Sequence, residues 1–161
     1  MKASIALARN IEDVFDFLRR PDNLIDKKLT GWISFDADGP VGADSTFNAN
    51  FKIGPFTGTA KYEVRVYERP YKLGLLVTSS AGRTVQNGWP IKRSDPPAVP
   101  PMEDLIELKA APGGTRLTRT FRVKSRNPIG WILGLPLSPL ANWGMRRDLH
   151  RLKARIESGL P

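Results

Sequence analysis

The sequence contains no cysteine and a single histidine, His150. Without cysteine the chain can form no disulfide, no thiolate zinc site and no thiol nucleophile. One histidine argues against a metal site built from several imidazoles, and a Ser-His-Asp triad would have to use His150. No acidic residue is placed to orient that imidazole. We therefore expect His150 to face solvent, and we expect neither a metal nor another cofactor.

Acidic residues are scarce in one part of the chain. Residues 115–155 contain ten lysines and arginines and one acid, Asp148, whereas the rest holds fifteen residues of each sign, so the net charge of +9 arises here. Such a face can attract phosphate groups of lipid, nucleic acid or an anionic ligand, or it can be solvated without a partner. We expect no nucleic-acid partner, because neither interleaved exposed aromatic residues nor a known motif accompanies the charge.

The stretch from Asn127 to Met145 has nineteen residues without a charge, which is near the length that spans a bilayer. Three prolines and three glycines interrupt it, so a spanning helix is not expected. The apolar run near the N-terminus is too short for the core of a signal peptide, and the prediction is a cytoplasmic protein. A further hypothesis is peripheral membrane docking through the basic face and the segment of Trp131, Ile132, Leu133 and Leu135.

Helical signals occur near both ends of the chain. Asn10 is a candidate N-cap, followed by Glu12 and Asp13 where the helix dipole favours acids. Ile11, Val14, Phe15 and Leu18 then share one helical face, and a second short helix begins at Pro21. The segment from about Pro139 to Ser158 predicts a long helix. Its apolar stripe consists of Met145, Leu149, Leu152 and Ile156.

Between these helices the hydrophobic period changes to two. Residues 2–8, 33–37, 47–53, 58–66, 73–77, 106–110 and 117–123 alternate between apolar and polar side chains, and Gly113 and Gly114 favour a tight hairpin turn. This pattern predicts an antiparallel sheet with one apolar and one wet face. The proline-rich segment from Ser80 to Pro101 breaks the rhythm and is expected to be a long loop, a feature that is often functional.

The order of elements predicts one α+β domain over residues 1–161. A chain of this length buries enough surface to fold without disulfides or a structural metal. A curved antiparallel sheet of six to seven strands has one apolar face to cover, and the last helix is the one predicted element long enough to cover it. A strongly curved sheet around one helix leaves space between them, and small molecules bind in such spaces.

Four segments in this order resemble one known family. They are Val14 to Asn23, which ends in a proline-acid-Asn turn, Glu68 to Leu73 in a mid-sheet turn, Gly114 to Thr118 at a strand start, and Leu149 to Glu157 in the closing helix. The chain is similar to the START-like, or SRPBCC, superfamily, and in particular to its polyketide cyclase/dehydrase-like branch. The resemblance covers nearly the whole chain, and the segment from Ser80 to Pro101 departs from it.

The resemblance implies a helix-grip fold with a deep apolar cavity. Members of the superfamily include lipid carriers, hormone receptors, aromatic cyclases and quinone-binding proteins, so the resemblance is specific for the fold and leaves the function open. The departure from Ser80 to Pro101 leaves the shape of the cavity mouth open as well.

The alternation also predicts which side chains face the interior. The candidate ligand-binding residues are Phe47, Phe51, Tyr62, Val64, Leu75, Asp104, Ile106, Arg119, Phe121 and Met145. Val77, Leu108 and Leu117 share the same phase. For each apolar member the alternative is plain core packing, because any sheet core requires such alternation.

Three polar members of this set are more informative. Arg119 and Asp104 fall in phase with buried positions, and a buried charge needs a partner. Arg119 would meet a carboxylate, enolate or phenolate of a ligand, or either residue would form a salt bridge at the cavity rim or turn outward at a bulge. The Tyr62 hydroxyl would bond a ligand oxygen or a backbone carbonyl. Trp89, in the expected loop, is a candidate lid residue or packs on its own domain.

Two main functions follow. The first is binding of a hydrophobic or aromatic small molecule, such as a lipid, a quinone or a polyketide, in an internal cavity. The second is a cyclase or dehydratase that holds a reactive chain in the same cavity and moves protons with Arg119, Asp104 or Tyr62. Those residues form no catalytic signature, so binding is the primary prediction. The ligand, the oligomeric state and the choice between carrier and enzyme stay open.

Overall fold

The computed structural model describes residues 1–24, 32–37, 39–53, 56–83, 85–86, 89–90, 99–124 and 138–159. Its strands are β1 (Lys2–Leu7), β2 (Trp32–Phe35), β3 (Thr46–Ile53), β4 (Phe56–Glu68), β5 (Lys72–Arg83), β6 (Val85–Gln86), β7 (Trp89–Pro90), β8 (Val99–Ala111) and β9 (Gly114–Val123). Its helices are α1 (Ile11–Leu18), α2 (Pro21–Leu24) and α5 (Ser138–Ser158). The expected order of strand, short helices, strands and long helix is confirmed.

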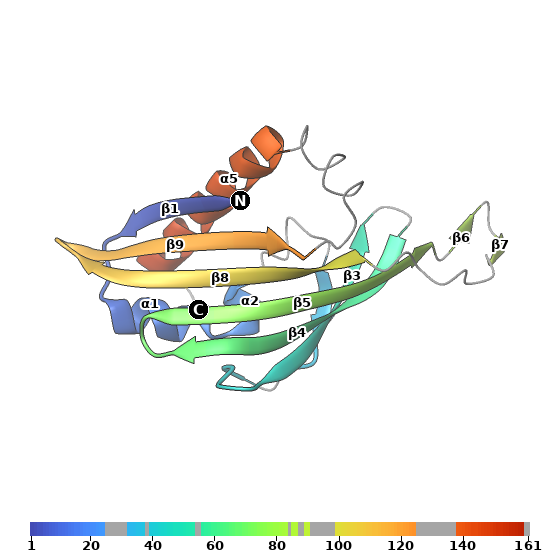
Figure 1. Ribbon diagram of the computed structural model, residues 1–161, viewed down its shortest axis with the longest axis horizontal. Helices are drawn as coiled ribbons and strands as arrows, with labels where there is room; N and C mark the ends of the chain where they lie inside the picture. The colour runs from blue at the N-terminus through green and yellow to red at the C-terminus, as the bar shows by residue number, and fades with distance from the viewer. Residues whose placement is uncertain are drawn as a thin grey trace.

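Seven strands form one antiparallel sheet in the order β1-β9-β8-β5-β4-β3-β2. The sheet curves, with α1 and α2 under one end and α5 crossing behind it (Figure 1). We call the face that packs against α1 and α5 the inner face. The arrangement confirms the expected α+β helix-grip architecture.

The first helix is capped as its sequence predicts. The side-chain oxygen of Asn10 accepts a hydrogen bond from the backbone N–H of Asp13 at 2.8 Å. That bond satisfies one of the N–H groups that a helix start leaves without a partner. Val14, Phe15 and Leu18 point into the core and are at most 1% exposed. Helix α1 therefore closes one end of the inner face.

Helix α5 has two functions in the fold. Its predicted stripe of Met145, Leu149, Leu152 and Ile156 is buried. Its other flank covers the free edge of β1, where Lys153 Nζ donates to the Ala6 carbonyl at 2.8 Å and the Ala8 N–H donates to Glu157 Oε1 at 2.8 Å. Lys153 and Glu157 also pair with each other at 2.6 Å. An edge strand that could otherwise pair with another chain is thus capped by side chains over part of its length.

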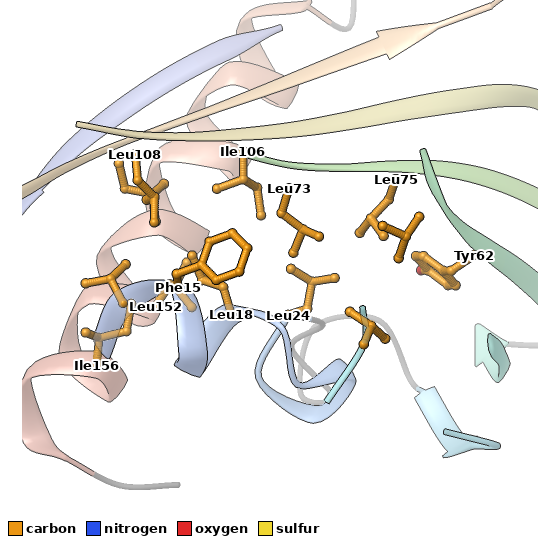
Figure 2. Packing of buried hydrophobic residues seen from close by; sticks show 14 of the residues in the cluster. Phe15, Leu18, Leu24, Tyr62, Leu73, Leu75, Ile106, Leu108, Leu152 and Ile156 are labelled. Atoms are coloured by element: carbon orange, nitrogen blue, oxygen red, sulfur yellow. The ribbon is translucent and has the colours of Figure 1, made fainter. Parts of the chain in front are cut away.

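Buried side chains of α1 and α5 meet those of the sheet at one end of the core. Phe15, Leu18 and Ile156 lie together there, whereas Tyr62 lies past Leu75 at the other end of the cluster (Figure 2). At the α1 end, the protein's own apolar side chains cover the inner face of the sheet. The functional question therefore concerns the end that contains Tyr62.

The prediction of one long loop from Ser80 to Pro101 is wrong at both ends of that segment. Strand β5 continues to Arg83 and β8 already begins at Val99, and the short strands β6 and β7 pair between them. Proline does not prevent this pairing where its position needs no backbone donor, as at a strand start or edge. Trp89 lies in β7, and its side chain falls outside the described part of the structure.

The Gly113-Gly114 turn supplies a test of the fold. Both glycines have positive φ, but a Cβ at Gly114 would lie 2.0 Å from the Leu7 carbonyl oxygen, whereas one at Gly113 would meet nothing within 4 Å. We expect Gly113→Ala to lower the free energy of unfolding by about 1–2 kcal/mol, the cost of the backbone conformation. Gly114→Ala must also displace β1, and we expect a loss of about 3 kcal/mol or more in urea unfolding. Equal losses would contradict the close approach of β1.

Candidate ligand-binding site

Most of the residues predicted to face the interior do so. Phe47, Tyr62, Val64, Leu75 and Ile106 are buried and belong to the cluster that α1 and α5 complete. Met145 is buried on α5, where its stripe faces the sheet. Phe51 pairs through its backbone with Gly58, and its side chain lies outside the described part. The alternation therefore predicts the correct face for every one of these side chains that the structure describes.

Two charged residues lie on the same inner face. Asp104 is 2% exposed, and the side chain of Arg119 is 14% exposed. They come from neighbouring strands, where Asp104 stands opposite Phe121 and Arg119 stands opposite Ile106, so the two are diagonal neighbours. Diagonal side chains on one face are within reach of a long arginine.

Asp104 and Arg119 form a buried bidentate ion pair. Arg119 Nε donates to Asp104 Oδ1 at 2.9 Å and to Oδ2 at 3.2 Å, and Nη2 donates to Oδ2 at 2.5 Å. The partner of each charge is the other, and this confirms the salt bridge among the sequence-based alternatives. The remaining guanidinium nitrogen, Nη1, has no acceptor among the described residues.

The electrostatics keep Arg119 charged. Burial disfavours the guanidinium charge, but the Asp104 carboxylate and its hydrogen bonds outweigh that effect, so the pKa of Arg119 lies above its usual value. The Asp148 carboxylate on α5 adds to the same shift. Arg119 is therefore a permanent cation in an apolar setting, with acids on both the sheet and the helix.

Tyr62 lies beside the pair and keeps its proton. Its ring stacks on Phe47 with centroids 4.7 Å apart and planes 3° from parallel. Burial raises the pKa of Tyr62 far above its usual value, the Asp104 carboxylate raises it further, and Arg119 opposes the shift. The hydroxyl is thus neutral at physiological pH and able to donate a hydrogen bond.

Phe121 is half-buried beside the ion pair. The Arg119 guanidinium carbon lies 4.7 Å from the centroid of its ring, a distance typical of a cation–π contact. The ring covers one side of the guanidinium. It therefore shields the pair from solvent and helps to hold the guanidinium plane in place.

The predicted alternation of residues 58–66 does not hold at its last residue, Val66. A register shift between Val64 and Val66 places Val66 opposite Gly74, and the next residue, Tyr67, packs on the core with its ring 5.4 Å from that of Phe15. A β-bulge inserts a residue into one strand and reverses the faces that follow. Val66 therefore lies on the outer face.

Sequence reasoning missed three contributors to the site. Asp148 follows Met145 by three positions and precedes Leu152 by four, a spacing on the flank of the helix stripe that could have indicated it. Ala49 and Ala60 stand opposite each other in register on the inner face and are at most 2% exposed. On the same face of β3 and β4, the small Ala49–Ala60 pair is therefore the neighbour of the large Phe47–Tyr62 pair.

The remaining sequence candidates do not enter this site. His150 is exposed on α5, as expected. Trp131, Ile132, Leu133 and Leu135 lie outside the described residues. Within the described part of the chain, no helix is long and apolar enough to cross a bilayer, and no three His, Asp or Glu side chains are grouped as metal ligands would be.

Comparisons with known proteins rest on structure. No family model and no curated protein matches the sequence. A conserved protein from Geobacillus kaustophilus is 20% identical over 96% of this chain and 93% of its own, with a TM-score of 0.61. DynU16, from the dynemicin biosynthetic locus, is 14% identical over 99% of this chain and 47% of its own, with a TM-score of 0.60. Ara h 8.0201 is 12% identical over 98% of this chain and 94% of its own, with a TM-score of 0.58.

Identities this low concern the fold. The chain shares with these three proteins a curved antiparallel sheet and a C-terminal helix. This confirms the expected helix-grip architecture. The polyketide cyclase/dehydrase-like branch remains a prediction from sequence resemblance.

The ion pair predicts an asymmetric mutational response. Asp104→Ala leaves a buried guanidinium without its carboxylate, and we expect the free energy of unfolding to fall by about 3–5 kcal/mol. The combined change Asp104→Leu with Arg119→Met removes both charges, and we expect it to cost less than Asp104→Ala alone. Urea unfolding measures both. Glu103→Ala, which breaks an exposed pair with Lys124, is the control and should cost about 1 kcal/mol or less. A double change that costs as much as Asp104→Ala, or more, would contradict the coupling.

Tyr62 predicts a loss of stability in alkali. Its folded pKa exceeds its unfolded value near 10, so the folded state binds this proton more tightly. The contribution is complete below pH 10 and falls above it by up to about 1.4 kcal/mol per pH unit. We expect Tyr62→Phe to flatten the fall in unfolding free energy between pH 10 and 11. Tyr71→Phe, at a 55% exposed position, is the control and should leave the slope unchanged. Identical slopes in all three proteins would show that Tyr62 is accessible to water.

Proposed function

We propose that the protein binds a hydrophobic or aromatic small molecule, of the lipid, quinone or polyketide class, in an internal cavity against the inner face of its sheet. The observation that carries this proposal is the polar group made by Arg119, Asp104 and Tyr62 on an otherwise apolar face. A buried ion pair seldom adds stability over apolar side chains of similar volume. Retaining one beside two aromatic rings is better explained by recognition of a ligand.

The pair also restricts the kind of ligand. Asp104 neutralises Arg119, so a ligand carboxylate would gain little from the guanidinium and would meet the repulsion of Asp104 and Asp148. The groups suited to an acceptor are Nη1 of Arg119 and the protonated Tyr62 hydroxyl. We therefore favour an uncharged carbonyl or quinone oxygen over the carboxylate, enolate or phenolate considered from the sequence.

The apolar part of the ligand would lie along β3 and β4. There Ala49 and Ala60 present methyl groups where Phe47 and Tyr62 present rings. The apolar chain or ring of the ligand would lie against these methyl groups. The polar end of the ligand would lie at the Phe47–Tyr62 stack. Such a mixture of apolar lining with a few placed polar groups is typical of ligand sites.

The alternative cyclase or dehydratase would need a group that exchanges protons near neutral pH. Tyr62 holds its proton and Arg119 holds its charge, since the pKa of each lies above its usual value. Both oxygens of Asp104 accept hydrogen bonds from Arg119. The geometry thus favours binding over proton transfer, and an enzyme in this cavity would act chiefly by holding a reactive chain in one conformation.

Native mass spectrometry of the purified protein, followed by extraction of bound compounds, tests the proposal. We also expect menadione and 2-decanone to raise the melting temperature more than decanoate does, because the ion pair favours uncharged oxygens. Tyr62→Phe should weaken binding of the ketone about threefold to tenfold, the effect of one hydrogen bond.

Ala60→Leu should block binding by filling the space beside the ring pair. Ala110→Leu adds the same volume at an exposed position of β8 and is the matched control. An empty protein that responds to none of these compounds, or one whose two leucine variants bind equally well, would contradict an internal site at this place. If Ala60→Leu fails to fold, the affinity of Tyr62→Phe for the ketone still tests the proposal.

A further inference from the structure

A pocket separate from the proposed cavity lies between residues Lys2 to Ile5 of β1 and the middle of α5. Its volume is about 450 Å³. Ala3 and Ile5 of β1 and Leu149 of α5 supply its apolar lining, and its polar lining comes from Lys2, Arg146 and His150. None of its described lining residues is acidic.

The pocket exists because the helix covers only part of the strand edge. Helix α5 crosses β1 at an angle (Figure 1). Its second half caps the edge at Ala6 and Ala8 through Lys153 and Glu157. Backbone groups of alternate residues point to the same edge of a strand, so the N–H of Ser4 also points there. No described residue accepts a hydrogen bond from it, and Ser4 lines the pocket.

Cationic groups converge on this place from both elements. Lys2 extends from β1, and Arg146 and His150, four positions apart, lie on the same flank of α5. None of the three forms an ion pair with another described residue. Positive groups without counter-charges, next to an open backbone N–H, form a setting in which an anion gains several charge-assisted hydrogen bonds.

We propose that this pocket binds a phosphate monoester that carries a short apolar group. Arg146, Lys2 and the Ser4 N–H hold the phosphate oxygens, and the carbon chain lies against Ala3, Ile5 and Leu149. The combination of cations with an apolar floor selects an amphiphile over inorganic phosphate. This site shares no residue with the proposed internal site, so either can fail without the other.

The single histidine provides a direct readout. His150 is the only histidine in the chain, so its imidazole C–H signals in a proton NMR spectrum are unique and report from the pocket wall. The probe is hexyl phosphate, with hexanol and inorganic phosphate as comparisons. We expect hexyl phosphate to shift the signals, inorganic phosphate to need higher concentrations, and hexanol to have no effect.

Variants separate the pocket from general charge. Lys2→Ala with Arg146→Ala should weaken binding of hexyl phosphate at least about tenfold. Lys109→Ala with Arg116→Ala removes the same two charge types from exposed positions on the β8–β9 hairpin and should leave binding unchanged. Each variant is compared at equal ionic strength, because surface attraction is salt-dependent.

A vesicle experiment distinguishes two sources of the phosphate. Sedimentation with phosphatidylcholine vesicles containing one-fifth phosphatidic acid, lost in the Lys2/Arg146 variant, would identify a lipid headgroup. Binding of hexyl phosphate without vesicle retention would identify a soluble phosphate. The proposal is overturned if hexyl phosphate leaves the His150 signals unchanged at millimolar concentration, or if the hairpin variant loses binding to the same extent as the pocket variant.

Discussion

The packing of α5 on the inner face is the contact on which the rest of the molecule depends. A seven-stranded antiparallel sheet with one apolar face is unstable in water until that face is covered, and α1 and α2 cover only one end of it. The stripe from Met145 to Ile156 buries more of that face, and another flank of the same helix caps part of the edge of β1. One helix therefore contributes both to the core and to the protection of a sheet edge.

The same helix separates two environments. Toward the sheet, its Asp148 acts on Arg119, which is paired with Asp104 and shielded by Phe121. At the outer edge of β1, Arg146 and His150 line a pocket together with Lys2, and none of its described lining residues is acidic. The inner environment is charge-balanced and mostly apolar and the outer one is cationic, so ligands of different chemistry suit the two.

Much of this arrangement could be predicted from sequence because short-range patterns decide it. The Asn10 cap, the stripe of α5 and the inward direction of Phe47, Leu75 and Ile106 follow from periods of 3.6 and two. The in-phase charges of Asp104 and Arg119 indicated buried partners for the same reason. Where a bulge intervenes, as before Val66, the period reverses, and no local signal in the sequence marks that position.

By itself, the sequence determined the class of fold, the apolar face of the sheet and the absence of thiol chemistry. Only the tertiary structure decided that Arg119 meets Asp104, that Phe47 stacks on Tyr62, that strands continue into the proline-rich segment and that α5 diverges from β1 to leave a pocket. The physical reason is that alternation assigns a side chain to a face, whereas its neighbours depend on strand register and helix crossing angle. Those are set by contacts between residues far apart in the chain.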